Sequence, residues 1–229
     1  MATRNILKDG ERGLLKKSRE VTDFNKRLHI LLDDMRETLI EANGLGLAAP
    51  QVGVLRRAAL IVDTGTAYEF PEELQDDDIE ELTDEQIKEL NIKRYNEQII
   101  ELVNPVIINK EGEQTGNEGC LSLPGVYGIV TRPETVLFKA YDRNGKVFEL
   151  EVYGLTARAV CHELDHLDGV IFTTIAERLL TEEELAEKAA QRDNEQRNNE
   201  QRNNEQAIDA SEKSDESNEN NQEAEKHHQ

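Results

Sequence analysis

The sequence predicts a mixed fold of helices and antiparallel strands, and three observations support this prediction. In residues 22–42, apolar side chains recur every three or four positions, which is the spacing of a helix packed on one face. In residues 136–152 they recur at every second position on both sides of an Asn-Gly pair, the pattern of a β-hairpin. Residues 155–167 form a second predicted helix, with Gly169 placed to end it.

The other elements are predicted around these three. The first helix has candidate caps at Thr22 and Asp23, and the Asn-Gly pair at 43–44 supplies its stop. Residues 58–62 are all apolar and predict a buried strand, and a second apolar strand pattern follows at 99–103.

Acidic residues gather in two segments. The formal net charge is −21, and residues 69–97 and 181–229 contribute −9 each. The first segment has too few apolar residues for a core of its own, so it predicts a surface insertion with a short capped helix at 83–90. The second starts with a short helix at Thr181 and continues into polar pentapeptide repeats, which predict a disordered tail. The predicted organisation is one folded body over residues 1–180 with a tail after it.

The composition also excludes several classes of protein. The body between the acidic segments shows no basic stripe, which argues against direct, sequence-specific nucleic-acid binding. No apolar run approaches the roughly 20 residues of a membrane span, and the N-terminus lacks the apolar stretch of a signal peptide. Two cysteines, Cys120 and Cys161, are too few for a disulfide framework and predict reduced thiols in a cytoplasmic protein.

The strongest chemical signal is the pentapeptide His162-Glu163-Leu164-Asp165-His166. On a helix, residues four apart share a face, so both imidazoles can reach one metal ion. Glu163 lies beside that face, where its carboxylate can take a proton from a water molecule that the ion activates. The motif therefore predicts a hydrolytic metal site.

A catalytic metal site needs a third protein ligand and one open position. Phe172 stands where metzincin proteases carry a third histidine, so the sequence does not fit the metzincin class. Glu177 and residues 182–184 offer later carboxylates, but nothing around them marks one as a ligand. Cys120 is the better candidate because a flanking glycine lets the backbone pass close to an ion, whereas Cys161 is predicted to be an ordinary buried thiol.

A glycine-rich segment, GLGLAAPQVG at residues 44–53, is the third motif. It lacks the Lys-Ser/Thr pair of a phosphate-binding loop. Small and apolar residues are followed by a single side-chain amide, that of Gln51, which suggests a backbone packed tightly against a site. At such a site the NH2 group of Gln51 would act as an oxyanion donor.

Together the three motifs resemble those of peptide deformylases, whose pattern is GxGxAAxQ, EGCxS and HExxH in this chain order. Here they occupy residues 44–51, 118–122 and 162–166, and matching residues run from about 4 to 175. The resemblance implies an α+β fold with antiparallel sheets around a central helix that carries the two histidines. The segment 123–128 resembles the version found in Gram-positive bacteria.

The resemblance also implies a role for each matched residue. Three residues would hold the metal: Cys120, His162 and His166. Three would line the substrate groove and methionine pocket: Leu45, Gly46 and Leu155. Glu163 would be the general base and acid, while Gln51 and the backbone N–H of Leu121 would stabilise the carbonyl oxygen as it gains charge. Glu118 would orient either the loop that carries Cys120 or the groups around the metal.

The implied reaction is hydrolysis of the N-formyl group from the formylmethionine of newly synthesised proteins, with release of formate. The implied cofactor is Fe²⁺, for which Zn²⁺, Ni²⁺ or Co²⁺ can substitute, and the implied partners are N-formylmethionyl nascent peptides with transient ribosome contact. Two alternatives stay open. One is a different metallohydrolase, a peptidase or amidase, which would release no formate. The other is a non-enzymatic protein whose acidic segments bind a partner, although such a protein has no need of the intact motif residues.

Overall fold

The structure is a computed structural model that describes residues 2–11, 13–65, 93, 95–187 and 190. The chain divides at Leu180 into two units, of which the first holds all three sequence motifs. Most of the predicted acidic insertion, with its predicted helix at 83–90, and the repeats after residue 190 lie outside the described residues. Among the residues that are described, no helix is both long and apolar enough to cross a bilayer.

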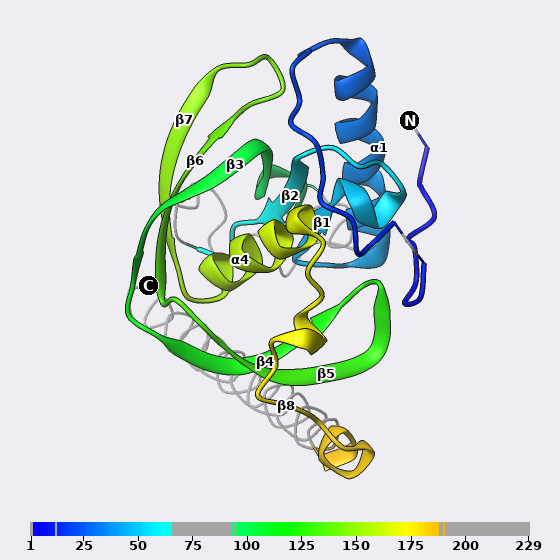
Figure 1. Ribbon diagram of the computed structural model, residues 1–229, viewed down its shortest axis with the longest axis vertical. Coiled ribbons are helices and arrows are strands. Elements are labelled where there is room, and N and C mark those ends of the chain that lie inside the picture. The colour runs from blue at the N-terminus through cyan, green and yellow to red at the C-terminus, as the bar shows by residue number, and fades with distance from the viewer. Residues whose placement is uncertain (1, 12, 66–92, 94, 188–189, 191–229) are drawn as a thin grey trace, which may run out of the picture. The chain divides into compact units, whose positions relative to one another are not determined.

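The first unit contains two antiparallel sheets (Figure 1). One has the strand order β1-β2-β3-β6-β7 and the other the order β4-β5-β8. In chain order the elements are α1 (Lys26–Ala42), β1 (Gly46–Ala48), the 3-10 helix η1 (Ala49–Val52), β2 (Ala58–Val62), β3 (Ile99–Glu111), β4 (Gln114–Cys120), β5 (Leu123–Arg132), β6 (Thr135–Tyr141), β7 (Val147–Tyr153), α4 (Gly154–Asp168), the 3-10 helix η2 (Phe172–Thr174) and β8 (Arg178–Leu179).

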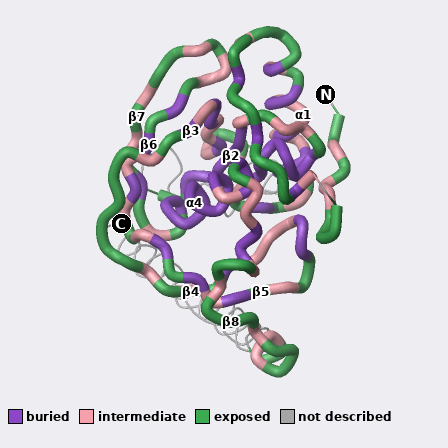
Figure 2. Tube along the Cα trace, viewed as in Figure 1, coloured by how far each residue is buried: buried purple, intermediate pink, exposed green. Residues whose placement is uncertain are grey.

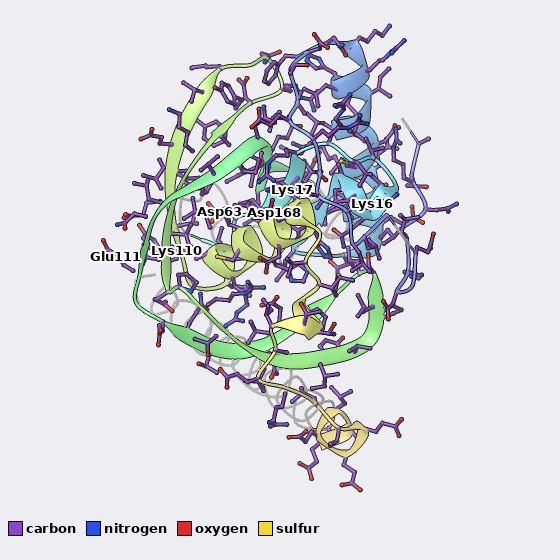
Figure 3. The ribbon with its side chains drawn as sticks, viewed as in Figure 1. Lys16, Lys17, Asp63, Lys110, Glu111 and Asp168 are labelled. Atoms are coloured by element: carbon purple, nitrogen blue, oxygen red, sulfur yellow. The ribbon has the colours of Figure 1, made fainter. Side chains whose placement is uncertain are left out.

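Helix α4 lies between the two sheets, as Figure 1 shows, and contacts β1, β2, β6 and β7 of one sheet and β5 of the other. It is buried along most of its length, which Figure 2 shows as nearly continuous purple. Its last residue, Asp168, accepts a hydrogen bond from Arg57 at 2.7 Å and lies 3.5 Å from Lys17, its neighbour in Figure 3. The predicted α+β fold, with antiparallel sheets around a central helix, is confirmed.

Helix α1 confirms the first predicted helix but starts four residues later than expected. Thr22 and Asp23 are not its caps: Asn25 is, because its side chain accepts hydrogen bonds from the backbone of Arg27 and Leu28. The predicted stop is correct, since Asn43 adopts the left-handed conformation with φ of 49°. The buried face of α1 packs with β2 in one apolar cluster.

The strand predictions were correct in place but incomplete. Residues 58–62 form β2 as expected, and the β6–β7 hairpin closes around the predicted turn. The strand predicted at 99–103 continues to Glu111 as β3. The β4–β5 hairpin was missed because β4, QTGNEGC, is rich in glycine and polar residues and carries no apolar alternation. Strand β1 was missed because it has three residues.

Candidate metal centre

Cys120, His162 and His166 come together where the end of β4 meets α4. Their ligand atoms all lie within 4.8 Å of one another, and Cys120 Sγ is 3.1 Å from His166 Nε2. The two imidazole rings are 4.8 Å apart between centroids and nearly perpendicular, at 83°. One thiolate and two imidazoles form a donor set suited to a divalent transition metal. The geometry therefore brings together all three predicted ligands.

The pKa shifts of the two histidines are also consistent with a bound metal ion. Burial, together with the neighbouring His162, lowers the pKa of His166 to about 3, so its ring is neutral and keeps a lone pair for a metal. Burial alone would lower the pKa of His162, but hydrogen bonds to Cys120 and Glu118 raise it to about 10. The surrounding acidic groups therefore favour positive charge at this ring, and a metal ion supplies that charge in place of a proton.

Glu118 contacts the Nδ1 atom of His162, which leaves the other ring nitrogen, Nε2, for a metal ion. Its Oε1 lies 2.6 Å from His162 Nδ1, and Arg132 binds both of its oxygens, with Nε at 3.0 Å and Nη2 at 2.6 Å. Burial would raise the pKa of Glu118, but these hydrogen bonds lower it to about 2. Because the ionised carboxylate can only accept, His162 Nδ1 donates and Nε2 is left for the metal. Glu118 thus contacts a proposed metal ligand, as its expected orienting role requires.

Glu163, which follows His162 on α4, lines the same cleft as Cys120 and His162. Its side chain is buried, and its Oε2 has no hydrogen-bond partner among the described residues. Burial raises the pKa of Glu163 to about 7, which places the carboxyl group where it can both take up and release a proton near neutral pH. Gly46 makes room for it: a Cβ at Gly46 would lie 2.3 Å from Glu163 Oε1. No residue with a side chain at position 46 could keep this arrangement unchanged.

Gln51 is fixed with its amide NH2 group toward the ligands. Its Oε1 accepts a hydrogen bond of 2.7 Å from the backbone N–H of Ala48, which settles the orientation of the amide. Its Nε2 lies 3.3 Å from Ser122 Oγ and 3.5 Å from Cys120 Sγ. Leu121 lines the same cleft directly after Cys120. Both expected oxyanion donors are thus beside the metal ligands.

A cleft of about 560 Å³ opens onto this centre. The predicted groove residues Leu45, Gly46 and Leu155 all line it, and Leu45 and Leu155 are 41% and 47% exposed at its mouth. Cys120, His162 and Glu163 also line it, whereas His166 lies behind them and is fully buried. The cleft therefore carries its buried ionisable groups at the base, while its exposed lining includes the apolar side chains of Leu45 and Leu155 together with Lys8.

The other candidates raised by the sequence lie apart from the centre. Glu177 accepts a hydrogen bond from Thr131 and takes no part in the Cys-His-His cluster. Cys161 is buried in the apolar cluster under the large sheet, as predicted. Phe172 is buried in a third apolar cluster, 6.1 Å from the ring of His162 between centroids.

Three contacts at the site were not anticipated from the sequence. Arg132 and Arg158 bind Glu118, and Arg158 stands four residues before His162, a helical spacing that could have indicated it. The hydroxyl of Tyr95 donates a hydrogen bond to the carbonyl oxygen of Gly44, and burial raises the pKa of Tyr95 to about 12. Tyr95 stands at the end of the predicted acidic insertion, so no local pattern linked it to the glycine motif.

Comparisons with known proteins agree on one family. The family model "Polypeptide deformylase" matches residues 3–181. The chain is 45% identical to the peptide deformylase of Caldicellulosiruptor bescii over 191 residues, covering 83% of this chain and 96% of the relative. It is 44% identical to peptide deformylase 1 of Bacillus subtilis over 187 residues, covering 82% and 98%. The second match agrees with the resemblance to Gram-positive members.

Solved structures give the same result for the fold. A peptide deformylase from Legionella pneumophila superposes with a TM-score of 0.61 at 34% identity, covering 86% of this chain and 96% of that one. A class I type b peptide deformylase from Acinetobacter baumannii, crystallised with Met-Ala-Ser bound, gives 0.60 at 29% identity, covering 76% and 99%. With its Cys-His-His cluster and the fold around it, this chain belongs to the peptide deformylases, metal-dependent hydrolases that remove the N-formyl group from nascent peptides.

Proposed function

We propose that Cys120, His162 and His166 hold an Fe²⁺ ion at which the formyl group of N-formylmethionyl peptides is hydrolysed to formate. The observation that carries this proposal is the convergence of their ligand atoms within 4.8 Å at the base of a cleft that also contains Glu163 and Gln51. When bound, the ion acts as a Lewis acid that activates water and polarises the formyl carbonyl.

Each protein group then has a separate task. Glu163 takes a proton from the attacking water and passes it to the leaving amine, a role supported by its burial and its pKa of about 7. The Gln51 NH2 group and the Leu121 backbone N–H donate hydrogen bonds to the carbonyl oxygen as negative charge develops on it. Glu118 keeps His162 in the tautomer that presents Nε2.

The shape and lining of the cleft suit a substrate that begins with a formyl group followed by methionine. A formyl carbon carries only hydrogen beyond its carbonyl, so it suits the approach past Gly46, where a Cβ would already meet Glu163. The apolar side chains of Leu45 and Leu155 at the mouth suit an unbranched methionine side chain. The Acinetobacter relative binds Met-Ala-Ser, the peptide that remains when formate leaves formyl-Met-Ala-Ser. We infer that the same groove receives the nascent chain here.

Formate release from formyl-Met-Ala-Ser, measured together with metal content, tests this function. The purified protein should release one formate per peptide and contain close to one metal ion per chain. A peptidase or amidase would instead cleave internal or terminal amide bonds of the unformylated peptide. Metal-replete protein that releases no formate would contradict the proposal.

The choice of Fe²⁺ needs its own test, because two imidazoles and a thiolate also hold Zn²⁺ tightly. The family resemblance favours iron, and the thiolate of Cys120 next to a redox-active ion should be open to oxidation. Protein reconstituted with Fe²⁺ should turn over faster than the Zn²⁺ form and lose activity faster in air than the Zn²⁺, Ni²⁺ or Co²⁺ forms. If the Zn²⁺ form is the fastest and iron brings no air sensitivity, the iron assignment is wrong.

We also propose a cytoplasmic enzyme that meets nascent chains at the ribosome without binding nucleic acid specifically. Both cysteines, Cys120 and Cys161, are free, as in a reducing compartment. The net charge of −21 disfavours tight contact with ribosomal RNA, so ribosome contact should be transient. Cosedimentation with translating ribosomes at several salt concentrations would measure this contact.

A further inference from the structure

The N-terminal strap, residues 6–9, lies against both segments that carry the proposed oxyanion donors. The backbone N–H of Leu7 donates to the carbonyl oxygen of Gln51 at 2.8 Å, and that of Asp9 donates to the carbonyl oxygen of Ser122 at 3.1 Å. Between them, Lys8 Nζ donates to the carbonyl oxygen of Leu121 at 3.0 Å. Three consecutive residues are therefore bonded to η1 on one side and to the loop after Cys120 on the other.

The strap is itself held at both ends. On its N-terminal side, the Arg4 guanidinium binds Asp34 of α1 at 3.1 and 2.9 Å, and its backbone N–H donates to Thr38 Oγ1. On its C-terminal side, a turn joins Lys8 and Glu11: the backbone N–H of Lys8 donates to Glu11 Oε1 at 2.9 Å, and the Glu11 N–H donates to the Lys8 carbonyl. A segment fixed in this way can restrict the positions of η1 and of the loop after Cys120, to which it is hydrogen-bonded.

Apolar contacts reinforce these hydrogen bonds. Ile6 packs against the cluster formed by α1 and β2. Leu7 packs against the third cluster, which contains Leu123 and Phe172. Adjacent residues of the strap thus reach two different clusters. Leu121 packs against the first cluster, as Ile6 does, whereas Cys120 and Leu123 on either side of the loop belong with Leu7 to the third.

We propose that this strap sets the relative position of the two oxyanion donors, and that Lys8 is a positioning residue for the loop that carries the Leu121 N–H; the proposal rests on the proposed function. The donors come from segments about seventy residues apart in sequence, and hydrogen bonds stabilise a developing oxyanion only when both lie close to about 3 Å from it. By binding the Leu121 carbonyl, the Lys8 ammonium restricts the backbone directly after the donor N–H. Lys8 also lines the cleft, but in this role it acts through the loop, so its loss should change kcat; a rise in KM instead would indicate direct contact with the peptide and overturn the proposal.

Lys8→Met tests the proposal because methionine keeps an unbranched chain but removes the ammonium donor. Removal of one such hydrogen bond should lower kcat for formyl-Met-Ala-Ser roughly three- to tenfold. The KM and the affinity for the product Met-Ala-Ser, measured by calorimetry, should stay within about twofold, because the oxyanion contacts form in the transition state. Lys8→Arg keeps a cationic donor and should restore at least half of kcat. Lys16→Met, an exposed lysine later in the N-terminal region and labelled in Figure 3, is the matched control.

Metal content and the melting temperature are recorded for each variant. A kcat for Lys8→Met equal to that of Lys16→Met overturns the proposal, and so does a loss of kcat that follows loss of metal. A fall in melting temperature with unchanged kcat also overturns it, because Lys8 would then be merely structural. Formate release by the wild-type protein is measured first and judges the proposed function separately, whatever the variants at Lys8 show.

Discussion

Glu163 combines two properties that are costly in a folded protein. It is a carboxyl group buried beside a metal centre, and one of its oxygens has no partner among the described residues. A buried acid of this kind would ordinarily be replaced by an apolar residue, because burial without pairing destabilises the fold. Its presence fits the proton transfer that we propose for it.

Glu163→Gln should leave the metal bound and lower kcat by roughly 10²–10⁴-fold, the usual contribution of general acid–base catalysis. Glutamine has the same shape and cannot carry the proton. Turnover, metal content and circular dichroism should be compared with those of Glu151→Gln, an exposed glutamate on β7. Metal loss in Glu163→Gln would mean that Glu163 acts as a ligand.

Gly46→Ala should reduce kcat by displacing the same carboxylate. The added methyl group would fall 2.3 Å from Glu163 Oε1 and 2.8 Å from its Cγ and Cδ, so the side chain of Glu163 must move. If the effect acts through Glu163, the double variant Gly46→Ala/Glu163→Gln should be no slower than Glu163→Gln alone. Additive losses in kcat would show instead that Gly46 contributes through the substrate groove independently.

At the scale of elements, the metal centre depends on how β4, β5 and α4 meet. Strand β4 supplies Glu118 and Cys120, strand β5 supplies Arg132, and α4 supplies the histidines and Arg158. Arg132 links all three elements, because its Nη1 also binds Asp165 of α4 at 2.6 Å. A two-pronged guanidinium is suited to fixing a carboxylate in one orientation.

Arg132→Met should weaken metal binding by about 10–100-fold, the range found when a group that supports a metal ligand is removed. Glu118 would then be held by Arg158 alone and could no longer fix the His162 ring as firmly. Competition with a chelator gives the affinity, and circular dichroism checks that the protein remains folded. Arg56→Met, at an exposed arginine, serves as the control. If the metal affinity of Arg132→Met were unchanged, Arg132 would contribute only to the stability of the fold.

At the scale of the whole molecule, the catalytic function belongs to the first unit. All proposed site residues precede Phe172, and the family match ends at residue 181. The second unit opens with a helix at residues 182–187, whose Thr181 and Glu184 exchange side-chain and backbone hydrogen bonds as a capping box. This helix start was predicted, whereas the disorder proposed for the repeats stays a prediction.

Truncation after residue 190 should therefore leave kcat, KM and the melting temperature close to those of the full chain. The removed residues are almost entirely polar and charged, so they add little apolar surface to bury. Turnover on formyl-Met-Ala-Ser and a thermal melt of both proteins provide the comparison. Aggregation of the shortened chain, or loss of most of its turnover, would show that the tail stabilises the catalytic unit.

The sequence by itself determined the elements with strong local periodicity and the chemistry of the site. The pattern in α1, the apolar run of β2 and the Asn-Gly turn of the β6–β7 hairpin all depend on neighbours a few residues apart. Likewise, the two histidines are brought together by the helical spacing of α4 alone. Cys120 and Gln51 were picked out by the glycines and small residues around them, and the family motifs then linked both to that helix, since no local rule connects them to it.

Only the tertiary structure decided which distant groups support these residues. Glu118 is an acceptor because hydrogen bonds from His162 and from Arg132 of β5 keep its pKa low within a buried site, and Arg158 of α4 adds a further hydrogen bond. The strap around Lys8 reaches Leu121 across more than one hundred residues of sequence. Such contacts involve one or two hydrogen bonds between segments without shared periodicity, so they leave no local signal in the sequence. They form only when packing of the apolar clusters brings the segments together, and this packing is what positions the catalytic groups.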